Sequence, residues 1–135
     1  MQIKFGNKSK VNLCNNLDYR LVHIVCEVAK LDCPCDFTVF ETKRSLERQK
    51  EYVKRGTSKT LNSKHIPDGK GIVRAVDIVP CISGKNTWDE KYLKQLIPLF
   101  KAVGNSLYPG EIEFGADWNT FRDMPHIQIK TGCEI

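Results

Sequence analysis

The sequence predicts an α+β fold in which a small antiparallel sheet packs with about three helices. Apolar residues recur at helical spacing in three segments, which indicates helices. Short runs of β-branched and aromatic residues lie between and after these segments, which indicates strands. The expected order is helix, strand, helix, strand, helix, strand, strand. This order favours an α+β fold over a parallel, doubly wound sheet.

The first half of the chain is expected to form two helices and a strand. Residues 9–31 are expected to form an amphipathic helix, because one stripe of it is apolar: Leu17, Leu21, Ile24, Val28 and Leu31. Residues 37–40 are β-branched or aromatic and are expected to form a strand. Ser45 can cap a second helix that ends at Gly56, with the side chains facing inward being those of Leu46, Gln49 and Val53.

The second half begins with a long loop. Residues 56–71 are rich in Gly, Ser, Thr, Asn, Lys and Pro, and a long loop in a compact domain is uncommon unless it has a function. A strand is expected over 72–79, followed by a turn at 83–86. The third helix is expected to begin at Thr87, with Glu90 completing a capping box, and Pro98 is expected to bend or break it. Residues 111–114 and 126–130 are expected to form two short strands.

Length and composition limit the classes of protein to consider. The 135 residues suffice for one domain, residues 1–135, and are too few for two of ordinary size. Hydrophobic residues make up 41% and charged residues 27% of the chain, which excludes a disordered, fibrous or membrane-spanning protein. The N-terminal residues lack the apolar segment of a secretory signal. We therefore expect synthesis in a cytoplasm and no stable membrane insertion.

The net charge of +5 is concentrated in residues 43–74, which hold ten Lys or Arg and three acidic residues. Such a stretch indicates either a solvated helix face or an anionic partner: nucleic acid, a polyanionic envelope or a carboxylate-bearing substrate. No zinc-finger or helix-turn-helix signature is present, so nucleic acid is not expected as a partner. The six cysteines include no C-x2-C pair and are expected to be reduced and mostly buried.

Two histidines and two aspartates form the group of residues that can take part in metal binding or catalysis. His65 lies in the long loop, Asp77 lies in the strand that follows, and His126 opens the last strand with Asp123 three residues before it. Two imidazoles and one carboxylate match the ligands of a catalytic zinc ion, and a further carboxylate can move the proton of a water. The same residues can equally be two surface histidines and an aspartate at a strand edge. Spacing alone leaves both interpretations open.

Four short motifs follow one another along the chain: Ser63-Lys64-His65, Ala75-Val76-Asp77, Phe114-Gly115-Ala116-Asp117-Trp118 and Asp123-Met124-Pro125-His126. In this order they resemble SxHxxGxAxD, G-x-D-W and D/E-x-x-H of the zinc-dependent D-Ala-D-Ala carboxypeptidase and L-Ala-D-Glu endopeptidase superfamily, which has a hedgehog-type fold. The resemblance covers nearly the whole chain. Within the superfamily, the sequence is most similar to phage endolysins that cleave the L-alanyl–D-glutamate bond of peptidoglycan stems.

The resemblance implies a role for each site residue. His65, Asp77 and His126 would bind Zn2+, and Asp123 would be the general base and acid. Arg44 would bind a substrate carboxylate or the developing oxyanion by charge-assisted hydrogen bonds; the alternative for this residue is a solvated arginine at a helix end.

The spacing of one motif departs from the family pattern. His65 and Asp77 are separated by eleven residues, 66–76, which is more than in the family motif. Asp68, which lies close to His65 in the sequence, is therefore an alternative to Asp77 as the carboxylate ligand of the metal. We favour Asp77, because a strand holds a ligand more rigidly than a loop tip does. Ser63 is expected to support the loop or the substrate, and Asp117 to have a structural role.

The function implied by the resemblance is that of a phage endolysin, a zinc metallopeptidase that hydrolyses the L-Ala-D-Glu bond of the peptidoglycan stem peptide and lyses the host. We expect a monomer that stays in the host cytoplasm until a separate holin releases it to the periplasm and cell wall. One alternative is a D-Ala-D-Ala carboxypeptidase with the same zinc site. The other is a non-enzymatic, zinc-stabilised nucleic-acid-binding domain that uses the basic stretch.

Overall fold

The fold is built on one antiparallel sheet. The computed structural model describes residues 1–58, 63–120 and 122–135. The strands are β1 (Asp36–Glu41), β2 (Ala75–Ile82), β3 (Lys85–Asn86), β4 (Ile112–Phe114) and β5 (His126–Ile129). The order across the sheet is β1-β2-β5-β4, with β3 paired to β2, and each pairing is antiparallel. The helices are α1 (Asn7–Leu13), α2 (Tyr19–Ala29), α3 (Leu46–Lys54) and α4 (Glu90–Leu107), and a 3-10 turn, η1, spans Gly115–Asp117.

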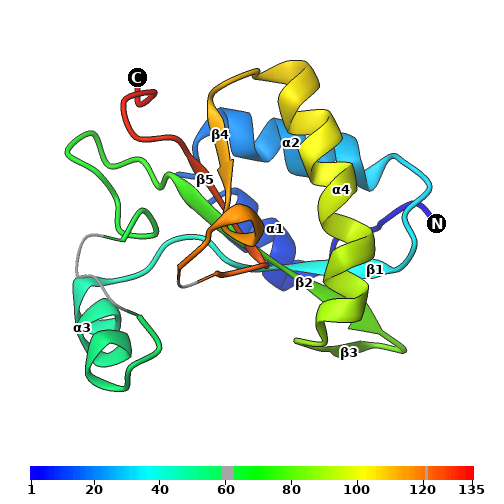
Figure 1. Ribbon diagram of the computed structural model, residues 1–135, viewed down its shortest axis with the longest axis horizontal. Coiled ribbons are helices and arrows are strands. Elements are labelled where there is room, and N and C mark those ends of the chain that lie inside the picture. The colour runs from blue at the N-terminus through cyan, green and yellow to red at the C-terminus, as the bar shows by residue number, and fades with distance from the viewer. Residues whose placement is uncertain (59–62, 121) are drawn as a thin grey trace.

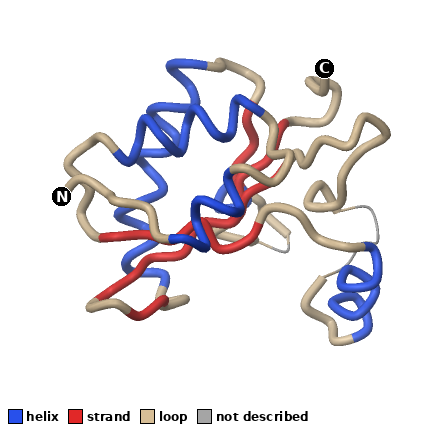
Figure 2. The backbone as a smooth tube through the Cα atoms, turned by 180° about the vertical axis from the view of Figure 1, so that it is seen from behind, coloured by secondary structure: helices blue, strands red, loops and turns tan. Residues whose placement is uncertain are grey.

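One face of the sheet packs against helices and forms the core, and the other face is turned away from it. α1 packs on β1, α2 packs on α4, and α4 packs on β2 and β4 (Figure 1). The core between these helices and the sheet includes apolar side chains of the two central strands, Val76, Ile78, Ile127 and Ile129. The alternate positions of the same strands face away from this core. Seen from behind, α3 stands apart from the other helices (Figure 2). This architecture confirms the predicted α+β class.

The expected helix over 9–31 is two helices, α1 and α2. Asp18 begins α2 by accepting a hydrogen bond from the backbone N–H of Arg20 at 2.9 Å. Before it, Asn16 adopts a positive φ of 58°, and Leu17 forms a parallel bridge with Val73. Leu17 is therefore buried by the strand-like bridge, not by a helical stripe. Because a buried residue stands at the expected spacing in either case, periodicity could not show the break.

The predicted start and end of α3 are confirmed. Ser45 accepts a hydrogen bond from the N–H of Arg48 at 3.1 Å, and Gly56, just after the helix, has a φ of +78°. The expectation that Leu46 faces inward is wrong, because this side chain is exposed. α3 lies away from the main core, and of its residues only Gln49 is buried.

α4 begins later and runs further than expected. Asp89, and not Thr87, is the N-cap: it accepts from the N–H of Lys91 at 3.0 Å, while the Thr87 hydroxyl accepts from the N–H of Asp89 at 3.2 Å. Pro98 lies inside the helix and does not break it. A proline there costs about 3 kcal/mol, and the buried face of α4 offsets that cost: Leu93, Leu96, Ile97, Phe100 and Gly104.

The strand expected over 72–79 is displaced toward the C-terminus and forms β2. It ends in a two-residue turn at Ser83 and Gly84, whose φ values are 52° and 80°, as a tight hairpin requires. The displacement leaves Asp77 inside the strand, opposite His126 of β5 and Glu41 of β1. In the segments that the structure describes, no helix is long and apolar enough to cross a membrane.

Candidate metal centre and its groove

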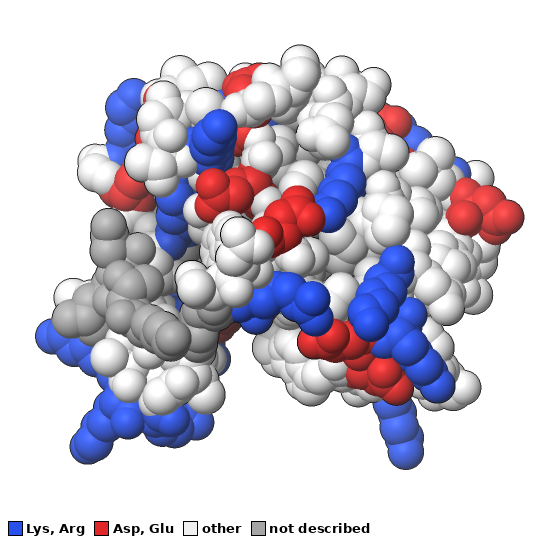
Figure 3. Space-filling model, viewed as in Figure 1, with Lys and Arg blue, Asp and Glu red and all other residues white. Residues whose placement is uncertain are grey.

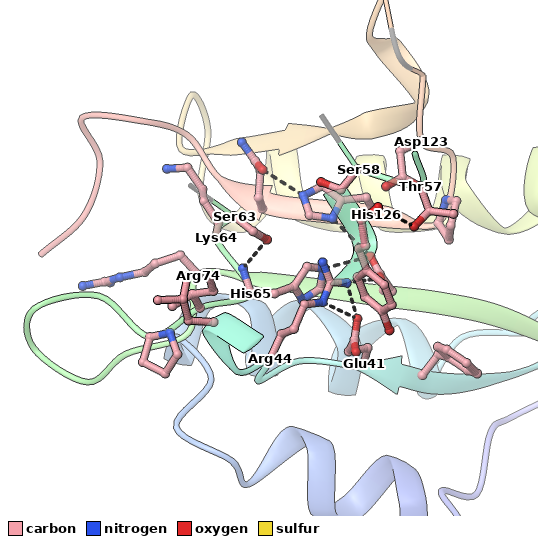
Figure 4. Close-up of a pocket in the computed structure, with 18 of the residues that line it drawn as sticks. Glu41, Arg44, Thr57, Ser58, Ser63, Lys64, His65, Arg74, Asp123 and His126 are labelled. Atoms are coloured by element: carbon pink, nitrogen blue, oxygen red, sulfur yellow. Dashed lines mark hydrogen bonds and ion pairs between the residues drawn. The ribbon is translucent and has the colours of Figure 1, made fainter. Parts of the chain in front are cut away.

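Three predicted ligands meet on the face of the sheet opposite the core. His65, Asp77 and His126 each offer one ligand atom, and these atoms lie within 4.8 Å of one another. The pairing of β2 with β5 places Asp77 beside His126, and the loop before β2 brings His65 to them. The ring centroids of the two histidines are 5.1 Å apart (Figure 4). The structure thus brings together residues that are far apart in the sequence.

His65 is held with one ring nitrogen free for a ligand bond. Its Nδ1 donates to the carbonyl of Thr42 at 2.8 Å, so the neutral ring keeps a lone pair on Nε2. Its own backbone is fixed as well, because its carbonyl accepts from the N–H of Arg44 at 2.8 Å and its N–H donates to the Ser63 hydroxyl at 3.2 Å. Nε2 is buried without a hydrogen-bond partner among the described residues. It lies 3.2 Å from Oδ1 of Asp77.

His126 is held in the opposite tautomer by a chain of hydrogen bonds. Nε2 of Gln128 donates to Glu113 at 2.9 Å, which fixes the orientation of the amide. The amide oxygen of Gln128 then accepts from Nε2 of His126 at 2.8 Å. Nδ1, the other ring nitrogen, lies 3.1 Å from Oδ1 of Asp77, and it carries the lone pair when the ring is neutral. Trp118 also donates to Glu113, at 3.2 Å, and its ring lies 5.4 Å from that of His126.

These three side chains fit a divalent metal ion. Burial raises the pKa of the Asp77 carboxyl, but the two imidazoles outweigh burial and hold that pKa well below its usual range. When both rings are neutral, an ionised carboxylate and two imidazole lone pairs converge. A buried polar atom without a partner is costly, and a metal ion would give Nε2 of His65 its missing partner. Catalytic zinc sites take three protein ligands of these types.

Asp123 lies beside the three ligands without belonging to their cluster. Burial first, and then the negative charge of Asp77, raise the pKa of the Asp123 carboxyl. The backbone around it is fixed: its N–H donates to the carbonyl of Gly115 at 3.0 Å, and its carbonyl accepts from the N–H of His126 at 3.1 Å. A Cβ on Gly115 would lie 2.1 Å from that carbonyl oxygen. The glycine therefore permits η1 to approach the segment that carries Asp123.

Arg44 lies within the same site and is oriented by two residues that sequence reasoning missed. Its Nε donates to Glu41 at 3.0 Å and one Nη donates to the amide oxygen of Gln49 at 2.7 Å. The other Nη, which also pairs with Glu41, lies 3.9 Å from Asp77. The guanidinium covers the ring of Tyr52 at 4.5 Å. Its expected role toward the substrate stays a prediction.

Glu41 escaped prediction because a β-bulge displaces it. Val39 pairs with Ile78, but the next pair is Glu41 with Asp77, so Phe40 is the additional residue. Strict alternation of side chains, which is the sequence signal for a strand face, fails at such a point. Gln49 gave a weak signal: it was expected to face inward, although only as part of a core.

The other candidate residues lie outside the metal cluster. Asp68 accepts from the N–H groups of Lys70 and Ile72 at 2.9 and 3.1 Å and pairs with Arg74 at 2.8 Å, so it organises the loop. Asp117 forms an ion pair with Lys101. The six cysteines all lie in described segments and are free thiols, but only Cys33 and Cys35 are buried, so the expectation that most of them are buried is wrong.

A large groove gives access to the centre. Its volume is about 1010 Å³, and it is lined by the three ligands, by Asp123 and by side chains of α3 and its flanking loops. In the space-filling view, the surface is hollowed between α3 and the sheet, and Lys and Arg gather over α3 (Figure 3). The volume of the groove is large enough to hold a segment of an extended peptide.

Comparisons with known proteins identify the family. The family model described as phage L-alanyl-D-glutamate peptidase matches residues 1–133. Among solved structures, the Serratia marcescens L-Ala D-Glu endopeptidase ChiX is similar, with a TM-score of 0.78 and 30% sequence identity over 93% of this chain and 89% of that chain. The comparison with curated proteins found no match. The matched residues include His65, Asp77 and His126 of the metal cluster, and also Asp123 and Arg44. The chain therefore belongs to the phage L-alanyl-D-glutamate peptidase family and is a peptidoglycan peptidase.

Proposed function

We propose that this peptidase is a zinc-dependent endolysin whose zinc ion is held by His65, Asp77 and His126. The observation that carries the proposal is the buried, unpartnered Nε2 of His65, which faces the carboxylate of Asp77 at 3.2 Å. Nδ1 of His126 faces the same oxygen from the other side, at 3.1 Å. When both rings are neutral, two lone pairs and one negative charge converge on a small volume inside the groove. Zinc, when bound, supplies Lewis acidity that polarises a carbonyl and acidifies a water.

The other residues of the site move the proton and stabilise charge. Asp123 takes a proton from the attacking water and returns it to the leaving amine of D-glutamate. The products are a carboxylate on L-alanine and a free amine on D-glutamate, so the atoms of one water are accounted for. The raised pKa of Asp123 suits a group that must accept this proton. Arg44, fixed by Glu41 and Gln49, holds a positive charge close to the position where the oxyanion develops.

The alternatives have less support. Both the family and the similar solved structure are named for cleavage of the L-Ala-D-Glu bond, which does not favour a D-Ala-D-Ala carboxypeptidase. A nucleic-acid-binding domain has no need of a buried histidine pair in a groove. The endolysin proposal includes a monomer that accumulates in the host cytoplasm and reaches the wall after a separate holin opens the membrane. The phage family supports that part of the proposal.

Lysis of bacterial walls tests the proposal. The turbidity of outer-membrane-stripped walls should fall on addition of the protein, a zinc chelator should stop the fall, and added zinc should restore it. Product analysis should find stem peptides that begin at D-glutamate. Asp123→Asn should bind one zinc ion per chain and lose at least about 100-fold in rate. Asp117→Asn, in the neighbouring η1 turn, is the matched control and should keep wild-type activity.

Three results would count against this mechanism. Lysis that continues in the presence of a chelator would show that no metal is required. Full activity of Asp123→Asn would show that Asp123 is not the general base. Release of free D-alanine would show that the enzyme cleaves the D-Ala-D-Ala bond instead.

A further inference from the structure

An exposed aromatic pair lies in the groove and takes no part in the mechanism above. Trp88 is 56% exposed, and its ring meets that of Phe40 edge to face, with centroids 5.0 Å apart. Both rings line the same groove as His65 and His126. Lys8 lies over the Phe40 ring at 3.8 Å, so Phe40 is packed and Trp88 remains open. An open tryptophan in a functional groove is a typical binding anchor, because it offers a large apolar face and a polar N–H.

The fold fixes Phe40 on the side of the sheet that carries the metal centre. Phe40 is the additional residue of the bulge in β1, and such a bulge turns side chains toward a site. The amide of Asn12 donates to the carbonyls of Val39 and Phe40 at 2.8 and 3.0 Å, which holds the bulge in place. The next residue, Glu41, holds Arg44. The aromatic pair is therefore continuous with the catalytic groove.

The segment that carries Trp88 follows β3 and lies alongside β2, and this placement sets its distance from the metal centre. Thr87, just before it, donates its N–H to the carbonyl of Pro80 at 2.9 Å. Pro80 is three residues beyond Asp77 in β2. Strand residues rise about 3.3 Å each, so the segment that carries Trp88 begins about 10 Å from the aspartate ligand.

The chemistry of the substrate requires a sugar at about this distance. The scissile carbonyl belongs to L-alanine, whose nitrogen is acylated by the lactyl group of N-acetylmuramic acid. One residue spans at most about 3.6 Å, and the lactyl group adds a similar length. A wall-attached stem therefore places a sugar ring within about 10 Å of the metal centre. An apolar, aromatic surface there can pack against the C–H face of that ring.

Exposed aromatic surface, and not net charge, marks the end of the groove suited to a sugar. Lys64 and Arg74 lie on the side of the histidine pair away from Glu41 (Figure 4), but Glu134, Asp68 and Asp18 balance their charges. The other end holds the open ring of Trp88, beside Phe40. A sugar ring can pack its C–H face on that surface.

We propose that Phe40 and Trp88 form a sugar subsite for the N-acetylmuramic acid ring and adjoining glycan of the stem being cleaved. The enzyme then prefers stems still attached to glycan over free stem peptides. This inference rests on the proposed cleavage of the L-Ala-D-Glu bond at the metal centre.

The test compares two soluble substrates: a GlcNAc–MurNAc tetrapeptide and the same tetrapeptide without sugars. The wild-type zinc enzyme should cleave the sugar-bearing substrate with about tenfold higher kcat/KM, the effect expected of one tryptophan anchor. Trp88→Ala should reduce this ratio toward one, and Trp88→Phe should restore part of it. Tyr19→Ala is the matched control, because Tyr19 is also exposed, at 61%, but lies outside the groove; its ratio should equal that of the wild type.

A second readout needs no turnover. Peptide-free GlcNAc–MurNAc oligosaccharide should change the tryptophan fluorescence of the metal-free wild type and not that of Trp88→Ala.

The kinetic comparison is protected against loss of folded protein. Because the ratio of kcat/KM for the two substrates is taken within one variant, partial unfolding lowers both rates and leaves the ratio intact.

The possible failures are distinct. A wild-type ratio of one, or an equal ratio in Trp88→Ala, overturns the sugar subsite while the peptidase activity stands. Failure of the wild type to cut either substrate overturns the proposed function, and with it the substrate on which the subsite depends.

Discussion

Gln128 decides which nitrogen of His126 is available, although it is not one of the three predicted ligands. Its amide accepts from Nε2 of His126 because Glu113 fixes its other end. Such partners of ligand histidines typically contribute 10–100-fold to metal affinity. We predict that Gln128→Leu weakens zinc binding by about 10–100-fold, as measured by competition with a chromophoric chelator. The ring 15N shifts of His126 should show both tautomers in the metal-free variant.

The matched control for Gln128 is Gln95→Leu on the exposed side of α4, which should bind zinc as the wild type does. Equal affinities in both variants would show that His126 keeps its tautomer without this amide.

We predict that Asp123 sets the acid side of the activity profile. Burial and the charge of Asp77 raise its pKa above the usual aspartate value. A general base acts only when deprotonated, so kcat/KM should fall as the pH falls through this raised pKa, and recover above it. The measurement is kcat/KM against pH, with zinc content determined at each point to separate loss of the base from loss of the metal. An acid limb at the pKa of an ordinary exposed aspartate, with zinc retained, would contradict this assignment.

At the scale of elements, η1 is the part that positions the segment before β5. A Cβ at Gly115 would lie 2.1 Å from the Asp123 carbonyl oxygen and 3.1 Å from Cβ of His126. Gly115→Ala therefore forces η1 away from the site, at a cost of about 1–3 kcal/mol. We predict a lower melting temperature together with a large loss of activity.

Gly69→Ala is the control for Gly115, since no atom lies within 4 Å of a Cβ built there. It should change neither thermal unfolding nor activity. Wild-type behaviour of Gly115→Ala would mean that the contact relaxes without moving Asp123.

The sequence predicted the elements whose signals are local. The strand at 37–40 and the cap at Ser45 depend on a few neighbouring residues, and both are confirmed. The break before Asp18 depends on a bridge from Leu17 to Val73, which no local pattern contains. The bulge that brings Glu41 to Asp77 depends on cross-strand pairing. The resemblance named three ligands that the structure does bring together, but their binding of zinc stays a prediction.

Across the whole molecule, a buried charge network ties distant segments together. Arg20 is fully buried and binds Asp18 and Glu111, at 2.8 and 2.7 Å. Arg74 binds Asp18 at 2.6 Å and Asp68 at 2.8 Å. The start of α2, the loop before β2 and the segment before β4 are joined in this way. Removing one partner of a buried pair leaves an uncompensated charge.

We predict that Asp18→Ala lowers the free energy of unfolding by about 3–5 kcal/mol, measured by urea denaturation. Asp89→Ala removes a helix cap of the same residue type on the surface, where α4 begins, and should cost about 1 kcal/mol. Similar losses in both variants would show that Asp18 acts as a helix cap alone.

β5 comes after the other strands along the chain but lies between β2 and β4 in the sheet. During translation, a nascent chain that has not yet released residues 123–129 from the ribosome lacks both His126 and Asp123, and its sheet has a gap at the centre. The metal cluster is thus completed only when β5, which follows the other described strands along the chain, takes its place between β2 and β4. A product that terminates before Asp123 therefore has neither a complete metal cluster nor the adjoining carboxylate, and we expect it to be inert.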